Sequence, residues 1–183
     1  MTRIMIVDDE PFILKALTRL LHQRTDWEIT TCETPETALQ ALASEHFDLI
    51  LSDYRMPGMT GVELLKQARI RQPDAARLIL SGQADMDAVL KAINDAEIYR
   101  FITKPWDDED LVITLRKALE HQQVIIENAR LAAEVKRQRQ QIRDQLAELR
   151  RLESEAPGIT RLNLDEEGYI VIRDEDVGDL DPS

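Results

Sequence analysis

Near the N-terminus the sequence reads Ile4-Met5-Ile6-Val7-Asp8-Asp9, four consecutive apolar residues followed directly by two aspartates. Similar short apolar runs recur at residues 49–51, 78–80 and 101–102, with a weaker one at 27–31. Runs of this length have the size of β-strands. Because they are continuous rather than alternating, they indicate strands buried on both faces, as in a parallel sheet covered by helices.

Stretches with helical spacing of apolar residues separate these strands, at residues 13–21, 38–42, 62–68 and 86–93. The alternation predicts an α/β fold, with a five-stranded parallel doubly wound sheet and helices on both faces. Five strands and five helices fit within residues 1–119. In such sheets the reactive site forms at the carboxyl ends of the strands.

Polar residues stand at those strand ends. Asp8 and Asp9 follow the first strand, Asp53 the third, Ser81 the fourth and Lys104 the fifth. Three carboxylates brought together repel one another and need a cation, for which a hard divalent ion such as Mg²⁺ is suited. Alternatively, each acidic residue only begins a loop or caps a helix. The occurrence of these five residues after four different strands of one sheet favours a shared site.

Four separated motifs resemble the receiver domain of two-component response regulators, which has a flavodoxin-like fold. The resemblance covers residues 3 to about 119. The motifs are Val7-Asp8-Asp9-Glu10-Pro11, Ser52-Asp53-Tyr54-Arg55-Met56-Pro57-Gly58-Met59-Thr60-Gly61, Leu80-Ser81-Gly82 and Phe101-Ile102-Thr103-Lys104-Pro105-Trp106.

The resemblance implies that Asp53 is the phosphoacceptor, which takes a phosphoryl group from a phosphohistidine of a sensor histidine kinase or phosphotransfer protein. It implies Mg²⁺ or Mn²⁺ as cofactor, bound by Asp9, Asp53 and the backbone carbonyl of Arg55, with Asp8 acting mostly through water. Lys104 is expected to pair with a carboxylate at rest and with a phosphoryl oxygen after transfer.

The same resemblance implies that Ser81 and Phe101 form a switch, in which the hydroxyl bonds the phosphoryl group and the ring turns inward. The family often has threonine and tyrosine at these two positions, so a signal that needs the phenolic oxygen is absent here. Tyr99 is expected on the same strand face as Phe101 and shares its role or is simply packed.

Three further residues have structural roles in this interpretation. Pro57 and Gly61 fit the turn after the acceptor, because proline fixes one backbone angle and glycine permits unusual ones. The Lys104-Pro105 bond is expected to be cis, as the resemblance implies and as proline permits.

The last helix of the receiver shows no stop signal, because residues 111–153 contain neither proline nor glycine. A helix of about 45 residues extends roughly 65 Å and is not stable alone. A seven-residue apolar repeat predicts a coiled coil over residues 120–155, in which Asn128 fixes register and favours a parallel homodimer. The alternative is a solvated helix that folds back on its own receiver. The predicted seam contains Asn128, Leu131, Val135, Ile142, Leu149 and Leu152.

Residues 156–183 form an acidic tail in this interpretation, with a possible β-hairpin made of residues 159–164 and 169–172. Pro157-Gly158 ends the helix before it.

The composition restricts the partners. A formal net charge of −12 disfavours direct binding to nucleic acid or to an anionic membrane. A basic cluster at residues 136–143 could grip nucleic acid, but a solvated coil face is the preferred interpretation. Cys32 is the only cysteine, which suits the cytoplasm.

The predicted function is therefore a response regulator that signals through its last receiver helix and coiled coil to a protein target. It is not expected to be an enzyme beyond slow self-phosphorylation and self-dephosphorylation. The alternatives are the regulatory portion of a longer cyclic-dinucleotide enzyme and a transcription regulator.

Overall fold

A computed structural model describes residues 1–82 and 97–155 of the 183-residue chain. The chain divides into two compact units, Met1–Asn128 and Ala129–Ser183. The predicted helix at 86–93 and the predicted hairpin in the tail lie outside the described residues. The division at residues 119 and 155 made from the sequence stays a prediction.

The first unit is built on a five-stranded parallel sheet with the strand order β2-β1-β3-β4-β5. This order is that of flavodoxin-like folds, and it reverses direction at β1. The predicted fold class is therefore confirmed. The strands are β1 Arg3–Val7, β2 Glu28–Cys32, β3 Leu49–Asp53, β4 Ala76–Gly82 and β5 Arg100–Lys104.

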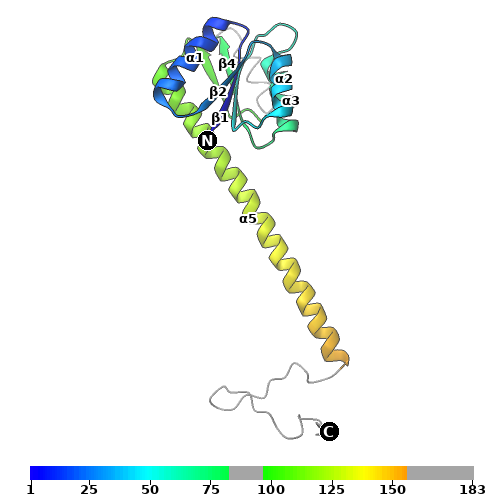
Figure 1. Cartoon of the computed structure of the whole chain (residues 1–183). Helices are drawn as coiled ribbons and strands as arrows, with labels where there is room; N and C mark the ends of the chain where they lie inside the picture. The colour runs from blue at the N-terminus through cyan, green and yellow to red at the C-terminus, as the bar shows by residue number, and fades with distance from the viewer. Residues whose placement is uncertain (83–96, 156–183) are drawn as a thin grey trace, which may run out of the picture. The chain divides into compact units, whose positions relative to one another are not determined.

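Helices cover both faces of this sheet, with α2 and α3 on one side and α1 on the other (Figure 1). Alternate residues of β1 point into opposite layers: Met5 packs in the core with α2 and α3, whereas Ile4 packs with α1 and the start of α5. This double burial is why the strand reads as an unbroken apolar run. The helices are α1 Pro11–Arg24, α2 Pro35–Ser44, α3 Gly61–Arg71 and α5 Asp108–Glu155.

Side-chain caps fix where the helices next to the strand ends begin. Thr60 accepts a hydrogen bond from the backbone N–H of Glu63, and the Glu63 carboxylate accepts one from the backbone N–H of Thr60. This reciprocal pair satisfies two N–H groups that the first turn of α3 leaves without partners. It holds Gly61 at the start of α3, directly after the loop that follows β3.

α5 is a single helix of 48 residues, which confirms the long helix predicted from the absence of proline and glycine. In its later turns, apolar side chains of the predicted seam, such as Leu131 and Ile142, are about half exposed. The coiled-coil pairing of this helix stays a prediction.

Within the described ranges, 1–82 and 97–155, no helix has the length and apolar character needed to cross a membrane.

Candidate functional site

Four strand ends bring polar side chains to one edge of the sheet. β1 ends at Val7, directly before Asp8, while Asp53 and Lys104 are the last residues of β3 and β5. The strands β3 and β4 are longer than the apolar runs suggested, so Asp53 and Ser81 lie within strands rather than after them. Since all strands are parallel, these ends meet at the same edge.

The Lys104 ammonium lies between two buried carboxylates. Its Nζ is 2.7 Å from Asp8 Oδ2 and 2.5 Å from Asp53 Oδ1. Asp8 is fully buried and Asp53 is 6% exposed. One cation thus bonds both carboxylates and offsets the cost of burying them.

Burial and neighbouring charges act in opposite directions on Asp53. Burial raises the pKa of this carboxyl above its ordinary value, and the negative charge of Asp8 adds to the rise. The hydrogen bond and the charge of Lys104, together with the backbone N–H of Arg55, partly oppose it. Burial acts to lower the pKa of Lys104, but its bonds to Asp53 and Asp8 outweigh that effect and raise it.

Backbone N–H groups bond the carboxylate oxygens that do not face Lys104. Arg55 donates its backbone N–H to Asp53 Oδ2 at 2.6 Å, and Glu10 donates its own to Asp8 Oδ1 at 2.9 Å. These donors fix the orientation of both carboxylates. The Asp53 carboxylate therefore presents Oδ1 to Lys104 and Oδ2 to the loop after β3.

Asp9, the third predicted carboxylate, is exposed beside this pair. Within residues 1–82 and 97–155, no group of three or more acidic, histidine or cysteine side chains is arranged to hold a metal ion. The metal-binding roles of Asp8, Asp9, Asp53 and the Arg55 carbonyl stay predictions.

Of the predicted switch residues, Ser81 lies on β4, the strand next to that of Asp53, and Phe101 lies on β5. The hydroxyl of Ser81 is buried and donates to the carbonyl of Gly82 at 3.2 Å. Phe101 is half-buried and packs against the core beneath α2 and α3. Tyr99 precedes β5, and its ring contacts His121 of α5 with the centroids 5.1 Å apart. Tyr99 therefore lies outside β5 and has a different neighbour from Phe101, and a shared role of the two rings stays a prediction.

The turn after the acceptor requires glycine. A Cβ added at Gly61 would lie 2.0 Å from the backbone oxygen of Asp53, a distance that no side chain tolerates. Gly58 has a φ of 81°, in the left-handed region that favours glycine, but a Cβ there would meet only the end of Glu36 at 3.7 Å. Pro57 is exposed in the same turn. The Lys104-Pro105 peptide bond is cis, as predicted.

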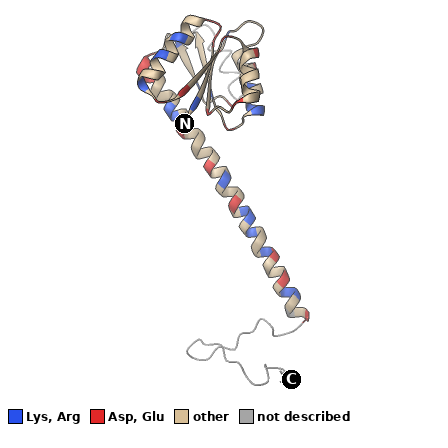
Figure 2. Ribbon diagram, viewed as in Figure 1, with Lys and Arg blue, Asp and Glu red and all other residues tan. Residues whose placement is uncertain are grey.

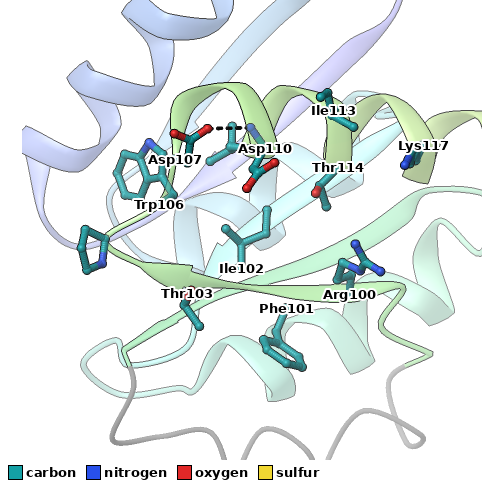
Figure 3. A pocket seen from close by; sticks show the side chains of 12 residues that line it. Arg100, Phe101, Ile102, Thr103, Trp106, Asp107, Asp110, Ile113, Thr114 and Lys117 are labelled. Carbon is teal, nitrogen blue, oxygen red and sulfur yellow. Dashed lines mark hydrogen bonds between the residues drawn. The ribbon is translucent and has the colours of Figure 1, made fainter.

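A pocket of about 350 Å³ lies between β5 and the first turns of α5 (Figure 3). Ile102 points toward α5, whereas Phe101 points away from it. At the start of the helix, Asp107 accepts hydrogen bonds from the backbone N–H groups of Glu109 and Asp110 and so caps it. Asp8, Asp53 and Lys104, which together form the acidic centre of the protein, do not line this pocket. The pocket is therefore separate from the acidic centre.

Two contributors to the site had no role in the sequence interpretation. The Ser52 hydroxyl donates to the backbone oxygen of Asp53 at 2.9 Å. Glu10 adds a third carboxylate, 4.0 Å from Lys104. Both residues stand in the quoted motifs, and their position next to an aspartate was the signal that could have identified them.

The fold and the site together define a doubly wound α/β protein with a buried aspartate, held by a lysine, at the switch in strand order. The chain belongs to the response regulator receiver domain family, whose pattern residues 4–116 match.

Among curated proteins the chain is similar to transcriptional regulators. It is 38% identical over 119 residues to the hydrogenase transcriptional regulatory protein HoxA of Cupriavidus necator, covering 65% of this chain and 24% of HoxA. It is 36% identical over 120 residues to the DNA-binding transcriptional regulator NtrC of Escherichia coli K12, covering 66% of this chain and 25% of NtrC. The chain thus spans about a quarter of the length of these relatives.

Solved structures give the same fold. The signal receiver domain of an HD domain-containing protein from Pseudomonas fluorescens Pf-5 is 39% identical, with a TM-score of 0.65, covering 69% of this chain and 92% of that one. A structure titled adenylate cyclase from Rhodopirellula baltica is 32% identical, with a TM-score of 0.67, covering 72% and 97% of the two chains.

Proposed function

We propose that Asp53 accepts a phosphoryl group from a histidine kinase or phosphotransfer protein, and that this chain is a phosphorylation-controlled signalling protein. The observation that carries the proposal is the buried Asp53 carboxylate, held by Lys104 at the switch in strand order of a receiver domain. In the part of the chain that the structure describes, Asp53 Oδ2 accepts the backbone N–H of Arg55 and Oδ1 bonds the Lys104 ammonium.

In the proposed transfer, a carboxylate oxygen of Asp53 forms a bond to phosphorus as the bond from phosphorus to the donor's histidine nitrogen breaks. Lys104 then exchanges its bond with Asp53 for one with a phosphoryl oxygen, while its bond with Asp8 keeps the ammonium at the site. Ser81 lies on the neighbouring strand with a hydroxyl that can rotate toward the phosphoryl group.

The donor set fits Mg²⁺ or Mn²⁺ as the cofactor of this step. Asp8, Asp9 and Asp53 offer only carboxylate oxygens, the hard ligands that such ions prefer. The bound ion would supply charge stabilisation for the transferring phosphoryl group. On the protein side, Asp8 and Asp53 are already oriented by the backbone N–H groups of Glu10 and Arg55.

Intact-mass measurement after treatment with a small phosphodonor and Mg²⁺ tests the acceptor. We expect a phosphoryl adduct on the wild-type chain and none on Asp53→Ala. The matched control is Asp26→Ala, which removes an exposed aspartate and should leave the adduct intact. An adduct that persists in Asp53→Ala contradicts the proposal.

The output in this proposal is an interaction with a downstream protein, made by two copies of the chain joined through α5. The apolar row along the later turns of α5 supports it. The chain acts in the cytoplasm and turns over no substrate beyond slow formation and hydrolysis of its own acyl phosphate. Molar mass by light scattering, with Mg²⁺ and with or without the phosphoryl mimic beryllofluoride, tests the pairing.

A second candidate is the regulatory portion of a longer protein. Relatives named as transcriptional regulators, an HD domain-containing protein and an adenylate cyclase favour it, since this chain matches only a quarter of the first group. Because some relatives are named as transcriptional regulators, the expectation that this chain does not contact nucleic acid has no support from the comparisons. Coding sequence continuous with the chain beyond Ser183 would decide for this candidate.

A further inference from the structure

The side of α5 that is turned away from its apolar residues carries a basic face. On an α-helix, positions seven residues apart fall almost on one line, so three such rows make up this side of residues 130–151. The two outer rows are basic, and the row between them is neutral and mostly small. One outer row holds Lys136, Arg143 and Arg150, the other holds Arg130, Arg137 and Arg151, and the middle row holds Ala133, Gln140 and Ala147.

The charges of this part of α5 are sorted by side. Lys and Arg recur along these turns of the helix in Figure 2. Within the basic face, Asp144 is the only acidic residue, whereas Glu134 and Glu148 lie on the flank of the apolar residues. All the side chains of the basic face are exposed. The face is therefore a strip of positive charge in solvent.

This positive charge is only partly neutralised within the helix. Arg151 pairs with Glu148 and Glu155. Across the described residues, by contrast, Lys136, Arg137 and Arg150 form no ion pair with an acidic side chain. Like charges held side by side repel one another, so a negatively charged segment that lies along the face gains free energy.

The same chain contains a segment of opposite charge. Residues 165–181 lie outside the described residues, and their sequence contains one basic residue, Arg173. The segment has eight acidic residues, which are Asp165, Glu166, Glu167, Asp174, Glu175, Asp176, Asp179 and Asp181.

The connection between the two is long enough for them to meet. Ten residue steps separate Glu155 from Asp165, and a chain of that length spans up to about 35 Å. The basic face is about 31 Å long from residue 130 to residue 151. A tether of this length keeps the acidic segment at an effective concentration of about a millimolar, so even a weak attraction is sufficient.

We propose that residues 165–181 bind along the basic face of α5 in the same chain. The bound segment covers the face and withholds it from other polyanions, such as nucleic acid. Because each ion pair in solvent is weak, the binding depends on several pairs together and on low salt. It requires neither phosphorylation nor pairing of α5, since the basic face lies away from the apolar residues.

Paramagnetic relaxation enhancement in the full-length chain measures this contact. A nitroxide is attached through Gln140→Cys, in the middle row of the face, while the native Cys32 is buried and stays unlabelled. At low salt we expect strong broadening of the amide signals of residues 165–181. Raising the ionic strength from about 0.01 M to 1 M shortens the Debye length from about 30 Å to 3 Å and should remove most of it.

Charge reversal separates attraction from the effect of the tether alone. Combining Arg137→Glu, Arg143→Glu and Arg150→Glu keeps the tether, yet should reduce the broadening at least about threefold at low salt. The matched control combines Lys15→Glu, Arg19→Glu and Arg24→Glu, which makes the same change in net charge on exposed residues of α1 and should leave the broadening unchanged.

A charge swap guards against damage to the helix. Adding Asp174→Arg, Glu175→Arg and Asp176→Arg to the reversed face should restore the broadening, because the attraction is then re-established with opposite signs. Circular dichroism of each variant reports whether α5 remains helical.

Three outcomes overturn the proposal. Equal broadening in the wild-type and reversed-face chains shows that only the tether brings the segments together. Broadening that is as strong between spin-labelled and isotope-labelled copies as within one chain shows that the segment binds a second copy. A chain without excess broadening that binds a labelled DNA duplex through Arg137, Arg143 and Arg150 shows that nucleic acid occupies the face instead.

Discussion

The acidic centre at the strand ends buries charged side chains, whereas the later turns of α5 expose both charged and apolar side chains. At the strand ends, Asp8 and Asp53 are buried and share one ammonium, while the apolar residues around them are covered. On α5, ion pairs such as Arg151–Glu148 stand in solvent with both side chains more than half exposed, and it is the apolar residues that are uncovered.

This difference in burial determines how much a substitution in each region changes the stability of the chain. A residue that contacts the acidic centre changes the stability of the receiver itself, because a buried charge has no solvent to replace a lost partner. A charged residue on α5 keeps water as an alternative partner, so its loss costs little within one chain.

The largest effect is expected where the backbone leaves no room for a side chain. Gly61→Ala should lower the free energy of unfolding by about 4 kcal/mol, because its Cβ would overlap the carbonyl of Asp53. Gly58→Ala, in the same turn, should cost only about 1 kcal/mol, since its Cβ makes an ordinary contact with Glu36 at 3.7 Å and the cost is strain in φ. Urea denaturation of both variants measures the difference, and equal losses would contradict this account.

Lys104→Met should be the next most costly change. It leaves Asp8 and Asp53 buried without their shared cation, and we expect a loss of about 3 kcal/mol at neutral pH. Lys15→Met removes an exposed lysine from α1 and should change stability by less than about 0.5 kcal/mol. Similar denaturation midpoints for the two variants would show that the buried pair is not a stabilising contact.

A smaller effect concerns the titration of Asp53, which carboxyl-carbon NMR can follow. Its pKa should lie above the ordinary value of 3.8, rise further in Lys104→Met and fall in Asp8→Asn, because Lys104 lowers it and Asp8 raises it. The folded chain then holds this proton more tightly than the unfolded chain. The stability that Asp53 contributes is therefore present below pH 3.8 and lost as the pH rises through its raised pKa. A midpoint below 3.8 in the wild-type chain would contradict the described burial.

The smallest effect is expected on α5. Arg151→Gln removes both ion pairs of this side chain, with Glu148 and Glu155, yet should lower helix stability by no more than about 0.5 kcal/mol. Circular dichroism during thermal unfolding measures it. A loss comparable to that of Lys104→Met would remove the contrast between the two regions.

Much of the fold and the site could be predicted from sequence because the signals are local. Runs such as Ile4–Val7 mark strands buried on both faces, and Asp53 and Lys104 stand where such strands end. The cis bond before Pro105 and the unbroken helix after Asp108 were also predicted.

What could not be predicted depends on three-dimensional packing. The sequence does not say that Lys104 bonds Asp8 and Asp53 at once, because that requires three strands at fixed spacing. Nor does it say that Tyr99 lies outside β5 against His121, since a strand's first residue is set by its neighbour's hydrogen bonds. The role of Gly61 likewise depends on a carbonyl eight residues earlier in the chain.

The placement of Lys104 also has a consequence for the proposed binding of a divalent cation. Because the Lys104 ammonium already bonds Asp8 and Asp53, a cation that binds these carboxylates, as proposed, has to displace it. The apparent affinity for the divalent cation then depends on how much more strongly the two carboxylates attract that cation than they attract the Lys104 ammonium. It should fall as the pH drops through the raised pKa of Asp53, because the proton competes for that carboxylate, and it should change again where Lys104 titrates, above the ordinary lysine value of 10.5 because the pKa of Lys104 is raised.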